Sequence, residues 1–323
     1  MSAVPHLTAE LFEIPGNPVP DDGVSGVLTI PGSISIRYAH WKSGVVPSRG
    51  TILLAHGRTE CIEKYFETIG DLQRLGFGVA TFDWRGQGGS TRLLSDPLKG
   101  HVEHFNQYLD DLDAVLTRVV LPDCKPPFYL LGHSTGGLVS LLAAPAVSNR
   151  INRVVLMSPM LKLDDLPIRQ RYLKHVLGLL TYTGFGRSYV PFTHGNIEKR
   201  DLDNNKLTSD WNRYKRGTEL AKHHWQLAVS GPTISWLHSA FRASEHIGQP
   251  GFASAISIPT LFILAGNDSV VSTSFSERYA QRMRAASFLT IAGARHEIFQ
   301  EADVYREQAL AAIDAFLPNA DGI

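Results

Sequence analysis

The sequence predicts an α/β protein with a mostly parallel, doubly wound sheet and a large helical insertion. Three observations lead to this fold class. After Gly50, short apolar strands alternate with amphipathic helices, which is the pattern of a parallel sheet covered by helices on both faces. Two β-rich runs before Gly50 predict a hairpin that adds antiparallel strands at one edge. Between Pro159 and Ile258 the alternation stops for about a hundred residues, which is too long for a bare loop in a compact domain.

The predicted strands are short and rich in β-branched and aromatic residues. The hairpin consists of Val24–Ile30 and Ser33–Trp41, with Pro31 and Gly32 at the turn. The remaining strands are Thr51–Ala55, Phe77–Phe82, Phe128–Leu131, Val154–Met157, Thr260–Leu264 and Ser287–Ile291. Several of these are almost continuously Val, Ile, Leu and Phe, as expected of strands with both faces buried.

Helical periodicity occupies the segments between these strands. The predicted helices are Ile62–Leu75, Val102–Val119, Gly137–Val147, Ser274–Ala285 and Ala302–Phe316. Connections from a strand through a helix to a parallel strand are right-handed. The order of elements therefore predicts helices on both faces of one sheet.

Residues 160–250 are predicted to form a helical lid, inserted between core segments 1–159 and 251–323. The segment has helical patterns that Gly and Pro interrupt, and it contains Trp211, Trp225 and Trp236. It carries 13 Lys and Arg against 8 Asp and Glu, whereas the whole chain has 31 of each. Because the chain as a whole is neutral, we expect no nucleic-acid partner.

Composition also bears on the compartment. Two cysteines, Cys61 and Cys124, are too few for a disulfide framework and agree with a reducing environment. The start of the chain lacks the basic and apolar regions of a secretory signal. No apolar run approaches the roughly 18 residues that a spanning helix requires. We expect a cytoplasmic protein, with peripheral contact to a membrane left open.

The motif Gly132-His133-Ser134-Thr135-Gly136-Gly137 follows one predicted strand and precedes a predicted helix. This is the setting that a G-x-S-x-G nucleophile elbow requires. The turn is tight and strained, so residues without side chains are needed where the strand and the helix approach each other. Ser134 is therefore the candidate nucleophile, and the N–H of Thr135 is a candidate oxyanion donor. The alternative is a chance match in a glycine-rich turn, which the flanking elements disfavour.

A serine hydroxyl needs a base to take its proton. His296 lies just after the last predicted strand and before the last helix, so position selects it from 13 histidines. His133 is expected to line the elbow. His101 and His104 form an H-x-x-H pair on a predicted helix, but no third ligand follows at a suitable spacing, so two ordinary polar residues are favoured over a metal site.

An acid must orient the imidazole and stabilise its charged form. Asp268 directly follows the strand Thr260–Leu264 and gives the order Ser, Asp, His along the chain. Asp164 and Asp165 are weaker candidates because they lie several residues into the predicted lid. Asp83 precedes Ser134 and is expected to be structural.

The loop after the strand Thr51–Ala55 supplies the second oxyanion donor in folds of this kind. It reads His56-Gly57-Arg58-Thr59-Glu60 in this chain. Gly57 permits a close turn, so the N–H of Arg58 is the candidate donor.

Together these motifs resemble the lysophospholipase and monoacylglycerol lipase branch of the α/β-hydrolases, which is similar to the serine aminopeptidase-like hydrolases. The resemblance runs from about residue 24 to the end of the chain and is loose only in the predicted lid. It is carried by His56-Gly57-Arg58-Thr59-Glu60, Phe82-Asp83-Trp84-Arg85-Gly86-Gln87-Gly88-Gly89-Ser90, the elbow, and His296-Glu297-Ile298-Phe299. The Arg-Gly-Gln-Gly and His-Glu-Ile-Phe stretches are the more specific features.

The resemblance implies an α/β-hydrolase fold with a Ser134–Asp268–His296 triad and oxyanion amides at Arg58 and Thr135. It implies an ester or lipid substrate that is cleaved through an acyl-enzyme, without a metal or cofactor. The family's commoner elbow has Met in place of Thr135, a change that a backbone donor tolerates. The His-Gly-Arg-Thr-Glu loop departs from the His-Gly-x-Gly-Glu-His form of monoacylglycerol lipases and is closer to the bacterial lysophospholipase-like form.

Two alternatives remain open at this point. An amidase or aminopeptidase could use the same scaffold, although a net basic lid is a poor receptor for a substrate amine. A non-catalytic binding protein could keep the fold, although such proteins often lack one member of the triad. The stretch Ile168–Leu180 has apolar residues at helical spacing between basic ones. It is expected to pack on the core, and contact with a membrane is the second interpretation.

Overall fold

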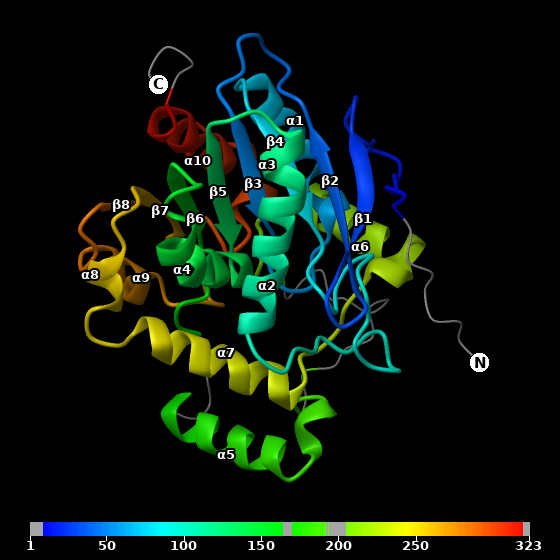
Figure 1. The fold of residues 1–323 in the computed structure, drawn as a ribbon, viewed down its shortest axis with the longest axis vertical. Helices are drawn as coiled ribbons and strands as arrows, with labels where there is room; N and C mark the ends of the chain where they lie inside the picture. Colours follow the sequence, from blue (N-terminus) through cyan, green and yellow to red (C-terminus); the bar gives the residue numbers. More distant parts are fainter. Residues whose placement is uncertain (1–8, 164–169, 192, 194–204, 319–323) are drawn as a thin grey trace.

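The computed structural model describes residues 9–163, 170–191, 193 and 205–318. Its centre is a twisted sheet of 8 strands in the order β1-β2-β4-β3-β5-β6-β7-β8 (Figure 1). The strands are β1 (Val24–Ile30), β2 (Ile34–Trp41), β3 (Thr51–Ala55), β4 (Gly78–Phe82), β5 (Phe128–His133), β6 (Arg153–Met157), β7 (Thr260–Ala265) and β8 (Ala286–Ile291). Every strand predicted from the sequence is present, with ends that move by two residues at most.

The predicted hairpin forms the edge of this sheet. β1 pairs with β2 in an antiparallel register from Val24 opposite His40 to Ile30 opposite Ile34, and β2 pairs antiparallel with β4. All pairings from β4 to β8 are parallel. Because the carboxyl ends of parallel strands lie at one edge of the sheet, the loops that follow β3, β5 and β7 come together there.

Helices cover both faces, as the order of elements predicts. The core helices are η1 (Ile62–Tyr65), α1 (Phe66–Arg74), α2 (Asn106–Val115), η2 (Leu116–Val120), α3 (Leu121–Asp123), α4 (Thr135–Val147), α9 (Thr273–Ala280), η6 (Ile298–Gln300) and α10 (Asp303–Phe316). Side chains alternate across the central strand β5: Leu130 joins the apolar cluster with α2 and α4, while Leu131 joins the cluster with α1 and α10. The predicted α/β-hydrolase fold class is confirmed.

One helix begins later than the sequence predicts. The expected helix Val102–Val119 starts at Asn106, so His101 and His104 lie in the preceding loop and not on a helix. Tertiary hydrogen bonds explain the difference, because Thr233 N–H donates to Gly100 O at 2.8 Å and Phe105 N–H donates to Ser239 Oγ at 2.9 Å. These bonds hold the loop in an extended form against the insertion.

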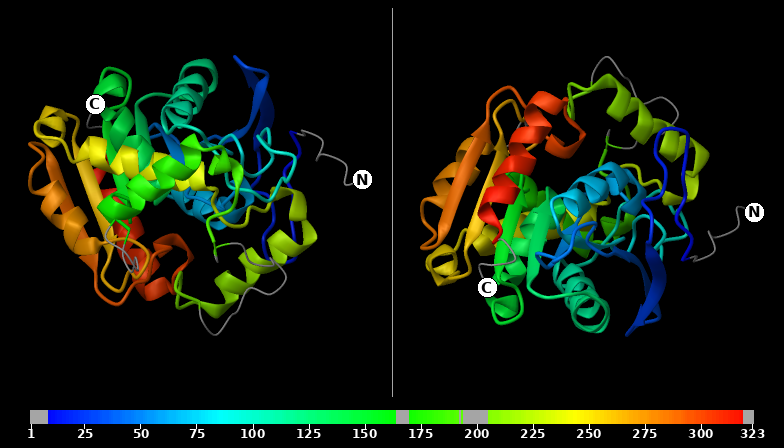
Figure 2. Two further views of the ribbon diagram at one scale, coloured as in Figure 1. Left: turned by 90° about the horizontal axis from the view of Figure 1, so that it is seen from below. Right: turned by 90° about the horizontal axis from the view of Figure 1, so that it is seen from above.

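The segment between β6 and β7 is helical where it is described, and it is called the insertion below. It contains α5 (Gln170–Tyr182), η3 (Phe185–Arg187), α6 (Trp211–His223), η5 (Trp225–Leu227), α7 (Ile234–Ile247) and α8 (Phe252–Ala255). α7 packs on α4 of the core, and α5 packs on the outer side of α7 (Figure 1). α6 lies apart from α5, on the side of α1 and α10 (Figure 2). The predicted helix Ile168–Leu180 corresponds to α5, and its first two residues lie outside the described part of the chain.

Candidate active site

Ser134 occupies the sharp turn between β5 and α4. Its backbone has φ +50° and ψ −113°, a strained conformation for a residue with a side chain. A Cβ on Gly136 would lie 2.0 Å from the carbonyl oxygen of Ala55, so only glycine fits where α4 crosses the end of β3. The strained turn and the missing side chain together hold the Ser134 hydroxyl at the carboxyl edge of the sheet, as predicted.

His296 and Asp268 meet Ser134 from two other loops. His296 Nε2 lies 3.0 Å from Ser134 Oγ, and His296 Nδ1 lies 2.7 Å from Asp268 Oδ2. The other carboxylate oxygen, Oδ1, accepts the N–H groups of Val270 at 2.8 Å and Val271 at 3.0 Å. Burial acts to raise the pKa of Asp268, but the bond to His296 and these two amides lower it below its ordinary value. The structure thus joins the three predicted residues in one hydrogen-bonded chain.

The competing residues have other surroundings. Asp83 is fully buried and lies 2.6 Å from Arg37 Nη2. Burial acts to raise its pKa, but Arg37 lowers it to about 2, so Asp83 is a structural anion. Asp164 and Asp165 lie outside the described residues. His101 Nδ1 lies 2.9 Å from Thr233 Oγ1, and the described residues contain no group of three or more His, Cys, Asp or Glu that could hold a metal.

The segments that carry the two predicted oxyanion amides both adjoin Ser134. Thr135 is the first residue of α4, so its N–H lies at the positive end of the helix dipole. In the loop after β3, a Cβ on Gly57 would lie only 3.2 Å from Ser134 Cβ. Arg58 follows at once, and its Nη1 donates to Ser230 O of the insertion at 2.8 Å. The loop after β3 therefore packs against Ser134, which agrees with the expected role of the Arg58 amide.

Comparison with known proteins agrees with this geometry. Residues 46–303 match the sequence model of the family Hydrolase_4, described as serine aminopeptidase, S33. The chain belongs to this family. It is 33% identical to lysophospholipase L2 of Escherichia coli (strain K12), over 82% of this chain and 79% of that protein. It is 29% identical to the probable lysophospholipase L2 of Haemophilus influenzae, over 88% of this chain and 89% of that protein.

Solved structures share the fold of this S33-family chain. A soluble variant of monoglyceride lipase from Saccharomyces cerevisiae, in complex with a substrate analog, superposes with a TM-score of 0.72 and 20% identity. That match covers 90% of this chain and 94% of the yeast chain. A thermostable carboxyl esterase from Bacillus coagulans gives a TM-score of 0.73 at 20% identity, covering 91% of this chain and 97% of that one. The relatives identify a lysophospholipase- and monoglyceride lipase-like α/β-hydrolase.

Sequence reasoning missed a buried polar network beside the triad of this hydrolase. Glu60 Oε2 accepts the Tyr65 hydroxyl at 2.7 Å and lies 3.2 Å from His133 Nδ1. Lys64 Nζ lies 3.0 Å from Glu60 Oε1 and 2.6 Å from Glu297 Oε1. Burial acts to lower the pKa of His133, but the charge of Glu60 raises it above its ordinary value. Glu60 and Glu297 stand in the motifs noted above, whereas Lys64 has no sequence signal.

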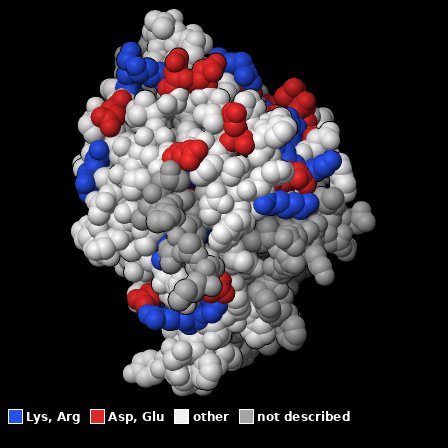
Figure 3. Space-filling model, turned by 90° about the vertical axis from the view of Figure 1, so that its right-hand side faces the viewer, with Lys and Arg blue, Asp and Glu red and all other residues white. Residues whose placement is uncertain are grey.

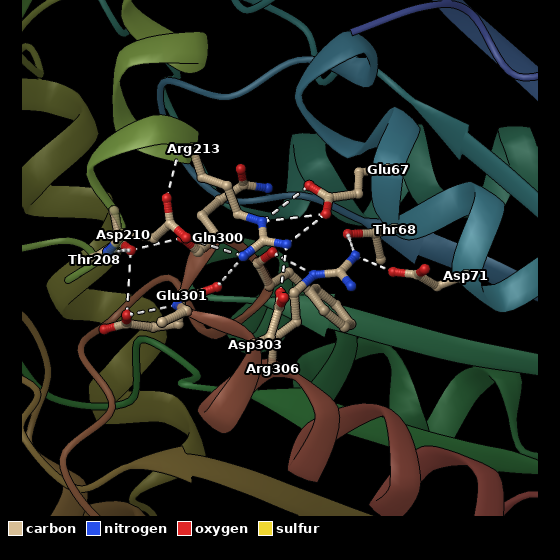
Figure 4. A network of polar contacts seen from close by, with 12 residues as sticks. Glu67, Thr68, Asp71, Thr208, Asp210, Arg213, Gln300, Glu301, Asp303 and Arg306 are labelled. Carbon is tan, nitrogen blue, oxygen red and sulfur yellow. Dashed lines mark hydrogen bonds and ion pairs between the residues drawn. The ribbon is translucent and has the colours of Figure 1, made fainter. Parts of the chain in front are cut away.

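Another group of residues missed from the sequence attaches the insertion to the core (Figure 4). Arg213 of α6 reaches Glu67 of α1 through Nη2 at 2.6 Å and through Nε at 3.0 Å. Arg213 Nη2 also lies 2.7 Å from Asp303, which begins α10. We call Arg213, Glu67 and Asp303 the α6 clamp. Its members are spread over three distant parts of the sequence, so spacing could not reveal them.

A small cavity of about 50 Å³ opens between α6 and the loop after β3. One wall is mainly apolar and comes from the insertion, and the other is polar and comes from the core. The lining residues are Thr59, Glu60, Cys61, Lys64, Leu207, Arg213, Tyr214, Gly217, Thr218, Leu220, Ala221, Leu227, Ala228 and Glu297. Thr59 and Glu297 are the sequence neighbours of Arg58 and His296, but none of Ser134, His296 and Asp268 lines the cavity itself.

Proposed function

We propose that this enzyme hydrolyses carboxylic esters of single-chain lipids, such as lysophospholipids or monoacylglycerols, with Ser134 as the nucleophile. The observation that carries the proposal is the hydrogen-bonded chain from Ser134 Oγ to His296 and on to Asp268, at 3.0 Å and 2.7 Å. Relatives that cover most of the chain are named lysophospholipase L2, which supports the substrate class.

The proposed reaction has two acyl transfers. His296 Nε2 takes the Ser134 proton while Oγ attacks the ester carbonyl, and the negative oxygen accepts hydrogen bonds from the amides of Arg58 and Thr135. The tetrahedral intermediate then expels the alcohol, which receives the proton from His296. A water molecule, deprotonated by His296, next attacks the acyl-enzyme. The bond between the acyl carbon and Ser134 Oγ then breaks, His296 returns the proton to Oγ, and the acid is released. Asp268 stabilises the imidazolium in both steps, because its carboxylate stays ionised.

The contacts of the insertion favour an ester over a peptide substrate. An aminopeptidase needs an acidic group to bind the substrate amine. Three acidic residues of the insertion are described, and each already lies within 3.1 Å of a basic one: Asp210 with Arg213, Glu219 with Lys222, and Glu245 with Lys174. The cavity beside Glu297 has the apolar wall that an acyl chain would contact.

Contact with a membrane is the second part of the proposal. The outer side of α5 and the turn after it expose large apolar side chains: Tyr172, Val176, Leu179, Tyr182 and Phe185. In Figure 3 the lowest part of the visible face, where Figure 1 places α5, shows uncharged residues. Arg187, with 74% of its side chain exposed, lies beside them, 3.9 Å from the Glu103 carboxylate. An apolar strip next to a cation suits the surface of an anionic bilayer.

The described helices include none that is long and apolar enough to cross a membrane. The proposed contact is therefore peripheral. Cys61 and Cys124 are both free thiols, which supports the expected reducing, cytoplasmic compartment.

Hydrolysis of p-nitrophenyl esters from acetyl to palmitoyl tests the chemistry. We expect turnover by the wild type and a loss of about 10⁶ in kcat for Ser134→Ala. Ser148→Ala, on the exposed end of α4, is the matched control and should keep full activity. A wild type that is inert on every ester, or a fully active Ser134→Ala variant, would overturn the proposal.

Co-sedimentation with vesicles tests the membrane contact. We expect Leu179→Ser to weaken binding to vesicles that contain an anionic lipid, without changing turnover of a short soluble ester. Val46→Ser is the control, because Val46 is 93% exposed in the loop between β2 and β3, far from α5 in the chain. Binding that depends on neither Leu179, nor the anionic lipid, nor salt would contradict this part of the proposal.

A further inference from the structure

The loop that carries the proposed Arg58 oxyanion donor contains a strained residue. Thr59 has φ +63°, in the left-handed region that residues with a Cβ rarely adopt. Its backbone N–H donates to Gln87 Oε1 at 2.7 Å. Gln87 is 1% exposed, so its acceptor is held in place by the surrounding packing. The bond therefore compensates for the strain at Thr59.

The amides on both sides of Arg58 have buried side-chain acceptors. Gly57 N–H donates to Glu60 Oε2, and Thr59 N–H donates to Gln87 Oε1. Because each peptide unit is planar, fixing the two flanking amides restricts rotation of the peptide that carries the Arg58 N–H. The same peptide is also held directly, because His56 Nδ1 lies 2.8 Å from Gly57 O. The direction of the Arg58 N–H then depends on His56, Glu60 and Gln87 together.

The Arg-Gly-Gln-Gly motif explains how Gln87 reaches this loop. Gly86 and Gly88 have φ of +80° and +50°, so the chain turns sharply on either side of Gln87. A Cβ on Gly88 would lie 2.1 Å from the Asp83 carboxyl carbon, which leaves room only for glycine. Gln87 N–H donates to Trp84 O at 3.0 Å, and Ser90 N–H donates to Gln87 O at 3.1 Å. The turn wraps around Asp83 and directs the Gln87 side chain at Thr59.

We propose that Gln87 is a positioning residue of the oxyanion hole, which aligns the Arg58 N–H by holding the Thr59 amide. Gln87 itself does not touch the reacting atoms. Because this role rests on the proposed function of the Arg58 amide, it should affect stabilisation of the tetrahedral intermediate and leave binding of the ground-state ester nearly unchanged. No other described residue bonds to the Thr59 amide.

Three variants of Gln87 test the proposal. Gln87→Met keeps the length of the side chain but removes the acceptor, and Gln87→Asn withdraws the acceptor by one methylene. Removing an oxyanion donor costs on the order of 10²–10³ in rate, so misaligning one should lower kcat by about 10-fold to 100-fold with KM within about 2-fold. Gln87→Glu keeps an acceptor at the same distance but buries a carboxyl at a site that is 1% exposed, so its kcat should lie between those of the wild type and Gln87→Met.

Affinity for a trifluoromethyl ketone separates positioning from a purely structural role. The ketone adds to the serine and forms a charged tetrahedral adduct, so its Ki should rise by the same factor by which kcat/KM falls. The melting temperature is recorded for each variant, and Gln87→Asn decides the test if Gln87→Met does not fold. The proposal is overturned if the deciding variant, Gln87→Met or otherwise Gln87→Asn, folds and keeps the kcat and the ketone affinity of the wild type.

Ser134→Ala provides the separate readout for the proposed function. An inactive Ser134→Ala together with an unimpaired Gln87→Met would refute only the positioning role. A fully active Ser134→Ala would refute the function on which that role depends.

Discussion

The backbone N–H of Glu297 donates a hydrogen bond of 2.8 Å to the carbonyl oxygen of Leu207. Leu207 belongs to the insertion, and Glu297 directly follows His296. Close by, the fully buried Glu301 accepts the N–H of Ser209 at 2.9 Å and that of Arg295 at 2.8 Å (Figure 4 shows Glu301). The part of the insertion around Leu207 and Ser209 therefore helps to hold His296, the candidate base.

The α6 clamp should stabilise this part of the insertion. Arg213→Ala removes the ion pairs with Glu67 and Asp303 and leaves the Glu67 carboxylate without its bidentate partner. The pair with Glu67 is partly buried, whereas Asp303 is 69% exposed and contributes little. We therefore expect the free energy of unfolding to fall by about 1–3 kcal/mol, between the values for surface and buried pairs. We also expect kcat/KM to fall by about 10-fold, since a small shift of a catalytic group is costly. Urea unfolding and ester hydrolysis measure the two effects.

Lys222→Ala is the matched control for this prediction. Lys222 lies on the same helix, and its ion pair with Glu219 is on the surface. We expect no measurable change in stability or turnover. Equal effects of Arg213→Ala and Lys222→Ala would show that the clamp does not hold the active site.

The clamp also predicts a pH dependence of stability. Burial acts to raise the pKa of Glu67, but hydrogen bonds from Arg213 and Arg216 lower it to about 2, from an ordinary value of 4.5. The unfolded chain takes up this proton as the pH falls through 4.5, whereas the folded protein resists it until about 2. The stabilisation is thus present above pH 4.5 and is lost between 4.5 and 2.

Glu67→Gln should lower stability at neutral pH and flatten this acid dependence. The midpoints of urea unfolding, recorded between pH 7 and pH 3, measure both effects. Glu245→Gln removes an exposed partner of Lys174 and should keep the slope of the wild type. A Glu67→Gln slope equal to that of the wild type would mean that this carboxylate does not contribute to acid unfolding.

The sequence was sufficient for the sheet and for the placement of Ser134, His296 and Asp268 because their signals are local. Apolar runs define the strands, and the glycines around Ser134 identify the elbow. Asp268 lies in the loop that follows β7, and His296 lies in the loop that follows β8. Parallel pairing then brings these loops to one edge. Nothing beyond strand order is needed to place them near one another.

Features that depend on tertiary contacts were not predictable. The loop with His101 has helical periodicity, but its backbone bonds to the insertion and so the helix begins only at Asn106. The bond from Thr59 to Gln87 spans 28 residues, and that from Lys64 to Glu297 spans 233. Such pairs have no periodic signal, although Gln87 and Glu297 both lie in stretches specific to the family branch.

Asp268→Asn should leave His296 in place but change which of its ring nitrogens carries the proton. The two N–H groups of Val270 and Val271 would retain the amide oxygen of the asparagine and turn its NH₂ toward His296 Nδ1. That contact favours the imidazole tautomer with a proton on Nε2, which cannot accept from Ser134. We expect kcat to fall by about 10⁴ with little change in KM.

Steady-state kinetics with the best p-nitrophenyl ester measure this loss. Asp314→Asn, which removes a surface partner of Arg49, is the control and should have normal kinetics. If Asp268→Asn keeps more than about one tenth of the activity, another group orients His296 and Asp268 is not the acid of the triad.

The cavity between α6 and the loop after β3 makes a prediction about chain length. Leu220 of α6 is 4% exposed and forms part of the apolar wall, together with Leu227. If the cavity holds the acyl chain, Leu220→Trp should make the cavity shorter and shift the optimal ester to a shorter acyl group. Activity on the acetyl ester should stay within about 3-fold of the wild type, because the new ring crowds the residues around position 220 and does not reach Ser134.

Val304→Trp, on the exposed side of α10, is the control and should leave the dependence of activity on acyl length unchanged. A Leu220→Trp enzyme that folds and keeps the wild-type profile would exclude the cavity as the acyl site, because any chain longer than the blocked space would have to lie elsewhere.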